Sequence, residues 1–158
     1  MDTPAVSAFR AASLFFAEAV AAVPADRYGQ PWSDEWRVLD LIGHGNRANL
    51  LPVEYYERPV QAVRSASERA WAVIESAPDG AVVGTPFGER TLDAYLPSRT
   101  AELVLHGLDL DTSIVPAAEA LVGCGAFLVT TAVGNGRGVD VVRALSGRGA
   151  LPPQFSVY

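Results

Sequence analysis

Apolar residues recur at three- and four-residue steps along much of the chain, which is the spacing of helices buried on one face. The first such segment covers residues 4 to 23. A second is expected to begin at Ser33, a favoured N-cap residue, and to run to about residue 50. A third begins at Pro59, which suits a first helical turn, and extends to about Ser76. The first half of the chain therefore predicts three helices.

The pattern changes after the turn at residues 78 to 80, and a short non-helical insertion is expected near residues 79–95. Helical spacing returns over residues 97 to 113. A fifth segment, residues 116 to 134, is apolar on most sides and is therefore expected to be buried. A short helix over residues 139 to 145 completes an all-α protein. Helices joined by short links predict an antiparallel four-helix bundle with an extra helix.

The size and charge of the chain restrict its class. Its 158 residues, 49% apolar and 19% charged, predict a single domain over residues 1–158 with a sizeable core. The net charge is −6, and all twelve basic residues are arginines. Because these arginines form no basic stripe, no nucleic-acid partner is expected.

Cysteine content and hydropathy bear on location. The single cysteine, Cys124, excludes an intrachain disulfide and fits a reducing cytoplasm. It lies in the apolar fifth segment with no basic residue near it in sequence, so we expect a buried, unreactive thiol. The first residues carry no charged signal-peptide region, and Glu119 interrupts the longest apolar stretch. We therefore expect a cytoplasmic protein without a membrane partner.

The chain has only two histidines, and both fall in predicted helices. Glu102 and His106 are four residues apart, so they share one helix face. With His44 from a neighbouring helix they would form a His, Glu, His set that leaves one coordination position open, which is the pattern of a catalytic divalent metal. The alternative is that this common spacing arises by chance and that the imidazoles are only packed or solvated.

Two charged residues lie close to this set in sequence. Asp109, three residues after His106, would accept a hydrogen bond from a metal-bound ligand or orient the imidazole. Its alternative role is a surface acid at a helix C-terminus. Arg47, on the second predicted helix, would present a guanidinium to an anionic substrate. Its alternative role is an ion pair with Asp40 or Glu54.

Several blocks of sequence resemble a known family. Residues 36–44, Trp-Arg-Val-Leu-Asp-Leu-Ile-Gly-His, are similar to the second-helix motif of the mycothiol-dependent maleylpyruvate isomerase N-terminal domain. Three further blocks resemble the second signature of that domain. They are Thr-Pro-Phe-Gly at residues 85–88, Arg99, and Glu-x-x-x-His-Gly-x-Asp-Leu at residues 102–110. Residues 147–156 resemble the end of that domain. The blocks follow the family order across nearly the whole chain.

The resemblance implies the DinB/YfiT-like superfamily, whose members are four-helix bundles that commonly hold zinc, or sometimes nickel or another divalent ion. It assigns His44, Glu102 and His106 as the metal ligands, and it matches Asp109 to a position associated with thiol binding. Enzymes of this superfamily use low-molecular-weight thiols such as mycothiol. The resemblance therefore implies a metal-dependent enzyme that transfers a thiol sulfur to a small electrophile or isomerises it.

The isomerase itself has a further C-terminal domain that helps to bind substrate, whereas this sequence ends at Tyr158. We expect Arg47, or a partner subunit in a possible homodimer, to supply the missing anion contact. An alternative of a different class is a non-catalytic metal-binding module with a stress-response or regulatory role. A third is a plain helical bundle without metal.

Overall fold

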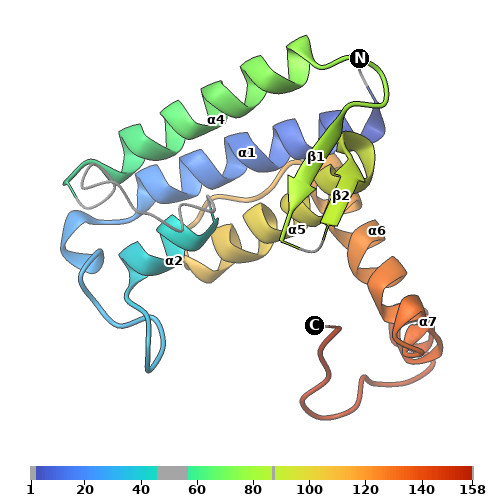
Figure 1. The fold of residues 1–158 in the computed structure, drawn as a ribbon. Helices are drawn as coiled ribbons and strands as arrows, with labels where there is room; N and C mark the ends of the chain where they lie inside the picture. The colour runs from blue at the N-terminus through green and yellow to red at the C-terminus, as the bar shows by residue number, and fades with distance from the viewer. Residues whose placement is uncertain (1–2, 46–56, 87, 158) are drawn as a thin grey trace.

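The computed structural model describes residues 3–45, 57–86 and 88–157, and these residues are mostly helical, as predicted (Figure 1). Two short strands pair antiparallel in a hairpin, with Val82 opposite Thr91. A 3₁₀ turn, η1, covers Ala25–Arg27. The helices are α1 (Pro4–Ala22), α2 (Val38–Gly45), α4 (Pro59–Ser76), α5 (Leu92–Asp109), α6 (Ala118–Gly134) and α7 (Gly138–Leu145), and the strands are β1 (Val82–Thr85) and β2 (Gly88–Thr91).

Helix α1 is the centre of the packing and contacts α4, α5 and α6 (Figure 1). Thr3 begins it, because its side-chain oxygen accepts a hydrogen bond from the Val6 amide. Phe16 and Val20 are buried on its inner face, as the spacing predicts. The helix is also long and apolar enough to span a membrane, but half of that window is buried inside the protein. A core helix has the same composition, so this is weak evidence for a membrane segment.

Helix α2 begins at Val38, so the prediction that it starts at Ser33 is wrong. Ser33 instead caps a tight turn, in which its hydroxyl accepts hydrogen bonds from the amides of Glu35 and Trp36. The Asp40 carboxylate then reaches back to the Arg37 amide at 2.9 Å, as in a capping box. The predicted end of this helix near residue 50 lies outside the described residues.

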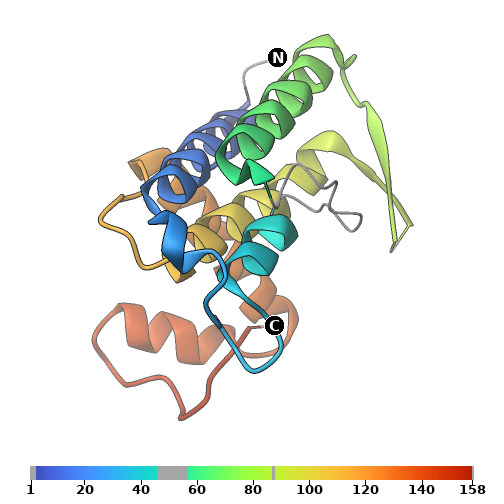
Figure 2. The same cartoon turned by 90° about the vertical axis from the view of Figure 1, so that its left-hand side faces the viewer.

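Helix α5 begins at Leu92 rather than at Pro97, which corrects the end of the predicted insertion at residues 79–95. The Thr91 side chain caps the helix by accepting a hydrogen bond from the Ala94 amide. Pro97 therefore lies inside the helix, where its ring cannot donate to the Asp93 carbonyl. The non-helical part of the insertion is the hairpin, which extends away from the helices in Figure 2.

Helix α6 is less buried than its apolar sequence predicts. Only Ala120, Cys124 and Ala132 of its described residues are buried, whereas Val122 is 71% exposed. The reason is that α6 contacts α1 and α5 on one side only, and with α7 it extends beyond the other helices (Figure 1). The expectation of a buried fifth helix is therefore wrong, although Cys124 itself is buried as expected.

Candidate metal centre

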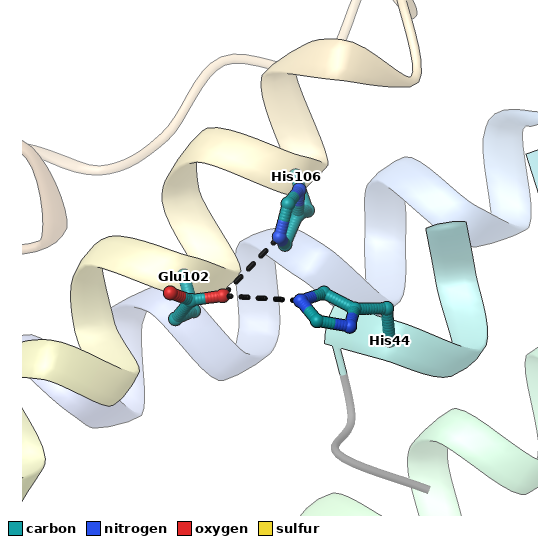
Figure 3. A group of neighbouring side chains, drawn as sticks. All are labelled: His44, Glu102 and His106. Carbon is teal, nitrogen blue, oxygen red and sulfur yellow. Dashed lines mark hydrogen bonds and ion pairs between the residues drawn. The ribbon is translucent and has the colours of Figure 1, made fainter. Parts of the chain in front are cut away.

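The side chains of His44, Glu102 and His106 converge between α2 and α5 (Figure 3). The Glu102 Oε2 atom lies 3.2 Å from His106 Nε2 and 3.8 Å from His44 Nε2. One donor atom from each residue lies within 4.8 Å of the other two. The three side chains therefore share one small volume, and of these contacts the helical spacing predicts the pair Glu102 and His106.

Two features of the backbone bring the helices together at this point. Glu102 and His106 are one turn apart on α5, so their side chains project in the same direction. One turn before Glu102 on the same helix, the Arg99 Nη2 atom donates to the carbonyl of Gly45 on α2 at 2.9 Å. Because Arg99 is buried and Gly45 follows His44, this bond fixes the described end of α2 against α5.

A glycine follows each histidine, and both glycines are in close contact with α1. A Cβ atom on Gly45 would lie 2.7 Å from Cζ of Phe16, and a Cβ atom on Gly107 would overlap Cε1 of Phe15. Any larger residue would force the Phe15 or Phe16 ring, or the helix that carries the glycine, to move. The two His-Gly pairs therefore set how closely both imidazoles approach each other.

Asp109 lies on the other side of the His106 ring from Glu102. Its Oδ2 atom is 3.3 Å from His106 Nδ1, so the carboxylate accepts a hydrogen bond from this nitrogen when the nitrogen carries a proton. A carboxylate in this position fixes the tautomer and orientation of a metal-binding imidazole. The sequence allows Asp109 to orient the His106 imidazole, to accept a hydrogen bond from a metal-bound ligand, or to be a surface acid at the helix end. The structure provides the contact that orienting the imidazole requires.

The charges within the group reinforce one another. The His106 hydrogen bond lowers the pKa of Glu102 against the opposing effect of burial, and Arg99 lowers it further. Burial lowers the pKa of His106, but hydrogen bonds to Glu102 and Asp109 outweigh it and raise that pKa overall. At neutral pH Glu102 is therefore an anion. It can accept a hydrogen bond from protonated His106, or bind a metal cation that replaces that proton.

The spacing of the donors fits a divalent transition metal. Ligand atoms about 2.0–2.1 Å from a tetrahedral zinc ion lie about 3.3–3.5 Å from one another. The two distances from Glu102, 3.2 and 3.8 Å, lie close to that range, and the donor atoms of the two histidines lie within 4.8 Å of each other. Two imidazoles and one carboxylate are ligands that suit zinc and nickel, and three protein ligands leave a position for a further molecule.

The side of the group formed by His44 is open to solvent, because the His44 side chain is 45% exposed whereas that of His106 is 17% exposed. The Trp36 ring packs against the His44 ring with centroids 4.7 Å apart. From the sequence, Trp36 is expected only as a packing residue at the start of the 36–44 motif, and Arg99 only as a motif residue. Arg99 could have been found from its spacing, because residues three and seven positions before a ligand share its helix face.

Two other candidates are not placed in this group. Arg47 lies outside the described residues. Cys124 is buried in α6, and burial raises the pKa of its thiol. A thiol with a raised pKa is a poor metal ligand and nucleophile at neutral pH, which agrees with its expected structural role.

Comparisons of this chain with protein-family models, curated proteins and solved structures find no match.

Proposed function

We propose that the protein binds a divalent metal ion, with zinc as the first choice and nickel as the second, through His44, Glu102 and His106. The observation that carries this proposal is the convergence of the three donor atoms within 4.8 Å. A packing histidine does not need a second imidazole and a carboxylate from another helix, whereas a metal site does. The carboxylate of Asp109 behind His106 adds the outer contact that metal-binding histidines commonly have.

We further propose that the protein is an enzyme that uses a thiol of the mycothiol type. A bound divalent ion would lower the pKa of such a thiol. The reaction would form a bond between the thiol sulfur and an electrophilic carbon, with loss of the thiol proton and of a leaving group, or add the thiol reversibly and so isomerise the substrate. Asp109 holds His106 in position, and its exposed edge is the proposed contact for the thiol.

We also propose that the fold is a four-helix bundle of the DinB/YfiT type and that the protein is cytoplasmic. The helical arrangement around α1 is compatible with an antiparallel four-helix bundle of the DinB/YfiT type. The resemblance of the motif order to that of the mycothiol-dependent maleylpyruvate isomerase domain supports it, as does the proximity of His44, Glu102 and His106. Low-molecular-weight thiols are reduced in the cytoplasm, so a cytoplasmic location belongs to the same proposal.

Metal content of the purified protein tests the proposal first. We expect about one equivalent of zinc or nickel in the wild type, and almost none in Glu102→Ala with the helical circular dichroism retained. Glu75→Ala, which removes an exposed glutamate from α4, is the matched control and should keep the metal. The second test is consumption of mycothiol with an alkyl halide, and activity that persists in metal-free protein would contradict the mechanism.

A second candidate is a metal-binding module without turnover that associates with a second copy of itself. The exposed apolar side chains of α6 and α7 favour it, since Val133, Val139 and Leu145 are each at least 60% exposed. A homodimer in sedimentation equilibrium, together with bound metal and no thiol consumption, would favour this candidate over the enzyme.

A further inference from the structure

A cleft of about 370 Å³ lies between α1, α4, α5 and β1, beside the metal centre. Gly45, which follows His44, lines it, and so does Leu103, which follows Glu102. Arg99 also lines it and lies close enough to Glu102 for its charge to lower the pKa of that carboxyl. The cleft therefore lies within one residue of the group along α2 and α5, although none of the three proposed ligands lines it. The volume is within the range of small-molecule sites, about 300–1,000 Å³.

The walls of the cleft are mainly apolar. Its surface comes from α1, α4, α5, the first strand and the end of α2, and its apolar lining residues include Phe9, Ile74, Val83, Leu92, Leu96 and Leu103. Such walls favour a ligand with an apolar body, because each apolar group that leaves water for the cleft gains free energy. A sugar or another highly hydroxylated molecule would leave most of its polar groups unpaired there.

The charged residues of the cleft have one sign. Arg69 on α4 and Arg99 on α5 line it, and none of its described lining residues is acidic. This differs from the chain as a whole, whose net charge is −6. Arg99 is only 9% exposed, and its bond to the Gly45 carbonyl holds the guanidinium in place. Fixed positive charge within low-dielectric walls attracts and orients an anion.

We infer that this cleft binds an organic monocarboxylate with an apolar body, held by Arg69 and Arg99 with its apolar part among the leucine, isoleucine and valine side chains. The inference deepens the proposed function and rests on it for the reaction, in which this anion would be the electrophile. It does not rest on the metal for binding. Cinnamate is a suitable probe, because it joins a phenyl ring to a carboxylate through an electrophilic double bond, and cinnamamide is its neutral counterpart.

Calorimetric titration with cinnamate and cinnamamide tests the class of ligand. We expect the purified protein to bind cinnamate about tenfold more tightly than cinnamamide, because only the acid pairs with the arginines. The preference should remain in Glu102→Ala, which lacks the metal. Equal affinity for the two probes would overturn the inference. So would a preference that disappears in Glu102→Ala, because the carboxylate would then be binding the metal.

Variants of the cleft wall test its location. Arg69→Gln should reduce the affinity for cinnamate about fivefold and leave that for cinnamamide unchanged. Val73 lines the cleft and is 63% exposed, so it tolerates a polar residue. Val73→Glu should weaken cinnamate binding about fivefold relative to Val73→Gln, which has the same shape without the charge. Val139→Glu on α7, at a valine that is 64% exposed and outside the cleft, should have no effect.

The outcomes separate this inference from the proposed function. Selective cinnamate binding that responds to Arg69 and Val73 supports the cleft, even if the protein contains no metal. Bound metal with thiol consumption, but with cinnamate affinity unchanged in both Arg69→Gln and Val73→Glu, overturns the cleft and leaves the proposed function standing.

Discussion

The ring of Phe15 on α1 packs directly against Gly107 on α5, so closely that a β-carbon at position 107 would overlap the ring. Gly107 is buried and follows His106, one of the proposed ligands. Phe16 and Gly45 repeat this arrangement on α2, next to His44. The distance between the two imidazoles therefore depends on the packing of two neighbouring phenylalanines against two glycines.

Gly107→Ala should destabilise the protein by about 1–3 kcal/mol, because the added methyl group forces Phe15 or the backbone of α5 to move. Chemical denaturation measures this loss, and metal content measures the accompanying shift of His106. Gly125→Ala on α6 is the control, since a Cβ atom there would meet nothing within 4 Å. It should instead stabilise the helix by about 0.5–1 kcal/mol. A neutral effect at position 107 would show that α1 does not set the position of His106.

Asp109→Asn should weaken metal binding by about 10- to 100-fold, because an amide oxygen accepts the Nδ1 proton of His106 more weakly than a carboxylate and so stabilises less the tautomer whose Nε2 can bind the ion. Competition with a chromophoric chelator measures the change. Asp111→Asn, two residues further along at an exposed carboxylate, should keep the wild-type affinity. If both variants bind metal equally well, the contact between Asp109 and His106 has no part in the site.

Sequence periodicity predicts the long helices well where a helix has one clear apolar face. Helices α1 and α4 have the predicted bounds to within one residue, since Thr3 and Pro59 mark their starts. It fails where a local hydrogen bond competes with the expected signal. Ser33 caps a turn instead of α2. Thr91 caps α5 and so begins this helix before Pro97, which the sequence pattern predicts as its start.

The candidate site is predictable in part for the same reason. The pairing of Glu102 with His106 follows from one helix alone, and Asp109 adds one further turn. The approach of His44 does not follow from local sequence, because it depends on the bond from Arg99 to Gly45 and on the contacts of Phe15 and Phe16. Such contacts join residues far apart in the chain, and periodicity carries no information about them.

Asp40→Asn should lower stability at neutral pH by about 1 kcal/mol or less, because Asp40 pairs with the exposed Arg37 side chain at the start of α2. The bond from Arg37 lowers the pKa of Asp40 in the folded protein. The stabilisation is therefore present above the pKa of the unfolded chain and is lost as pH falls through the folded value. Denaturation of both proteins at several pH values should show their difference shrinking in acid. A difference that does not depend on pH would assign the effect to lost hydrogen-bond geometry alone.

The stability of the protein without metal and its affinity for metal should change in opposite directions with pH. The pKa of His106 is raised in the folded protein, so its stabilising pairing with Glu102 and Asp109 is complete below the ordinary histidine value, about 6.5. That stabilisation is lost as pH rises through the raised folded value. Metal binding needs the neutral imidazole, so metal affinity rises over the same interval.

Thermal unfolding with a chelator and with excess zinc measures both effects. The interval from about pH 6 to about pH 8 covers the ordinary histidine pKa and the range just above it. Over this interval the metal-free protein in chelator should lose thermal stability, and the increase in thermal stability caused by zinc should grow. His106→Gln keeps a hydrogen-bonding side chain but cannot titrate, and it should remove most of both trends. A zinc effect that is constant over this interval would show that no histidine proton is released on binding, and His106 could then not be a ligand.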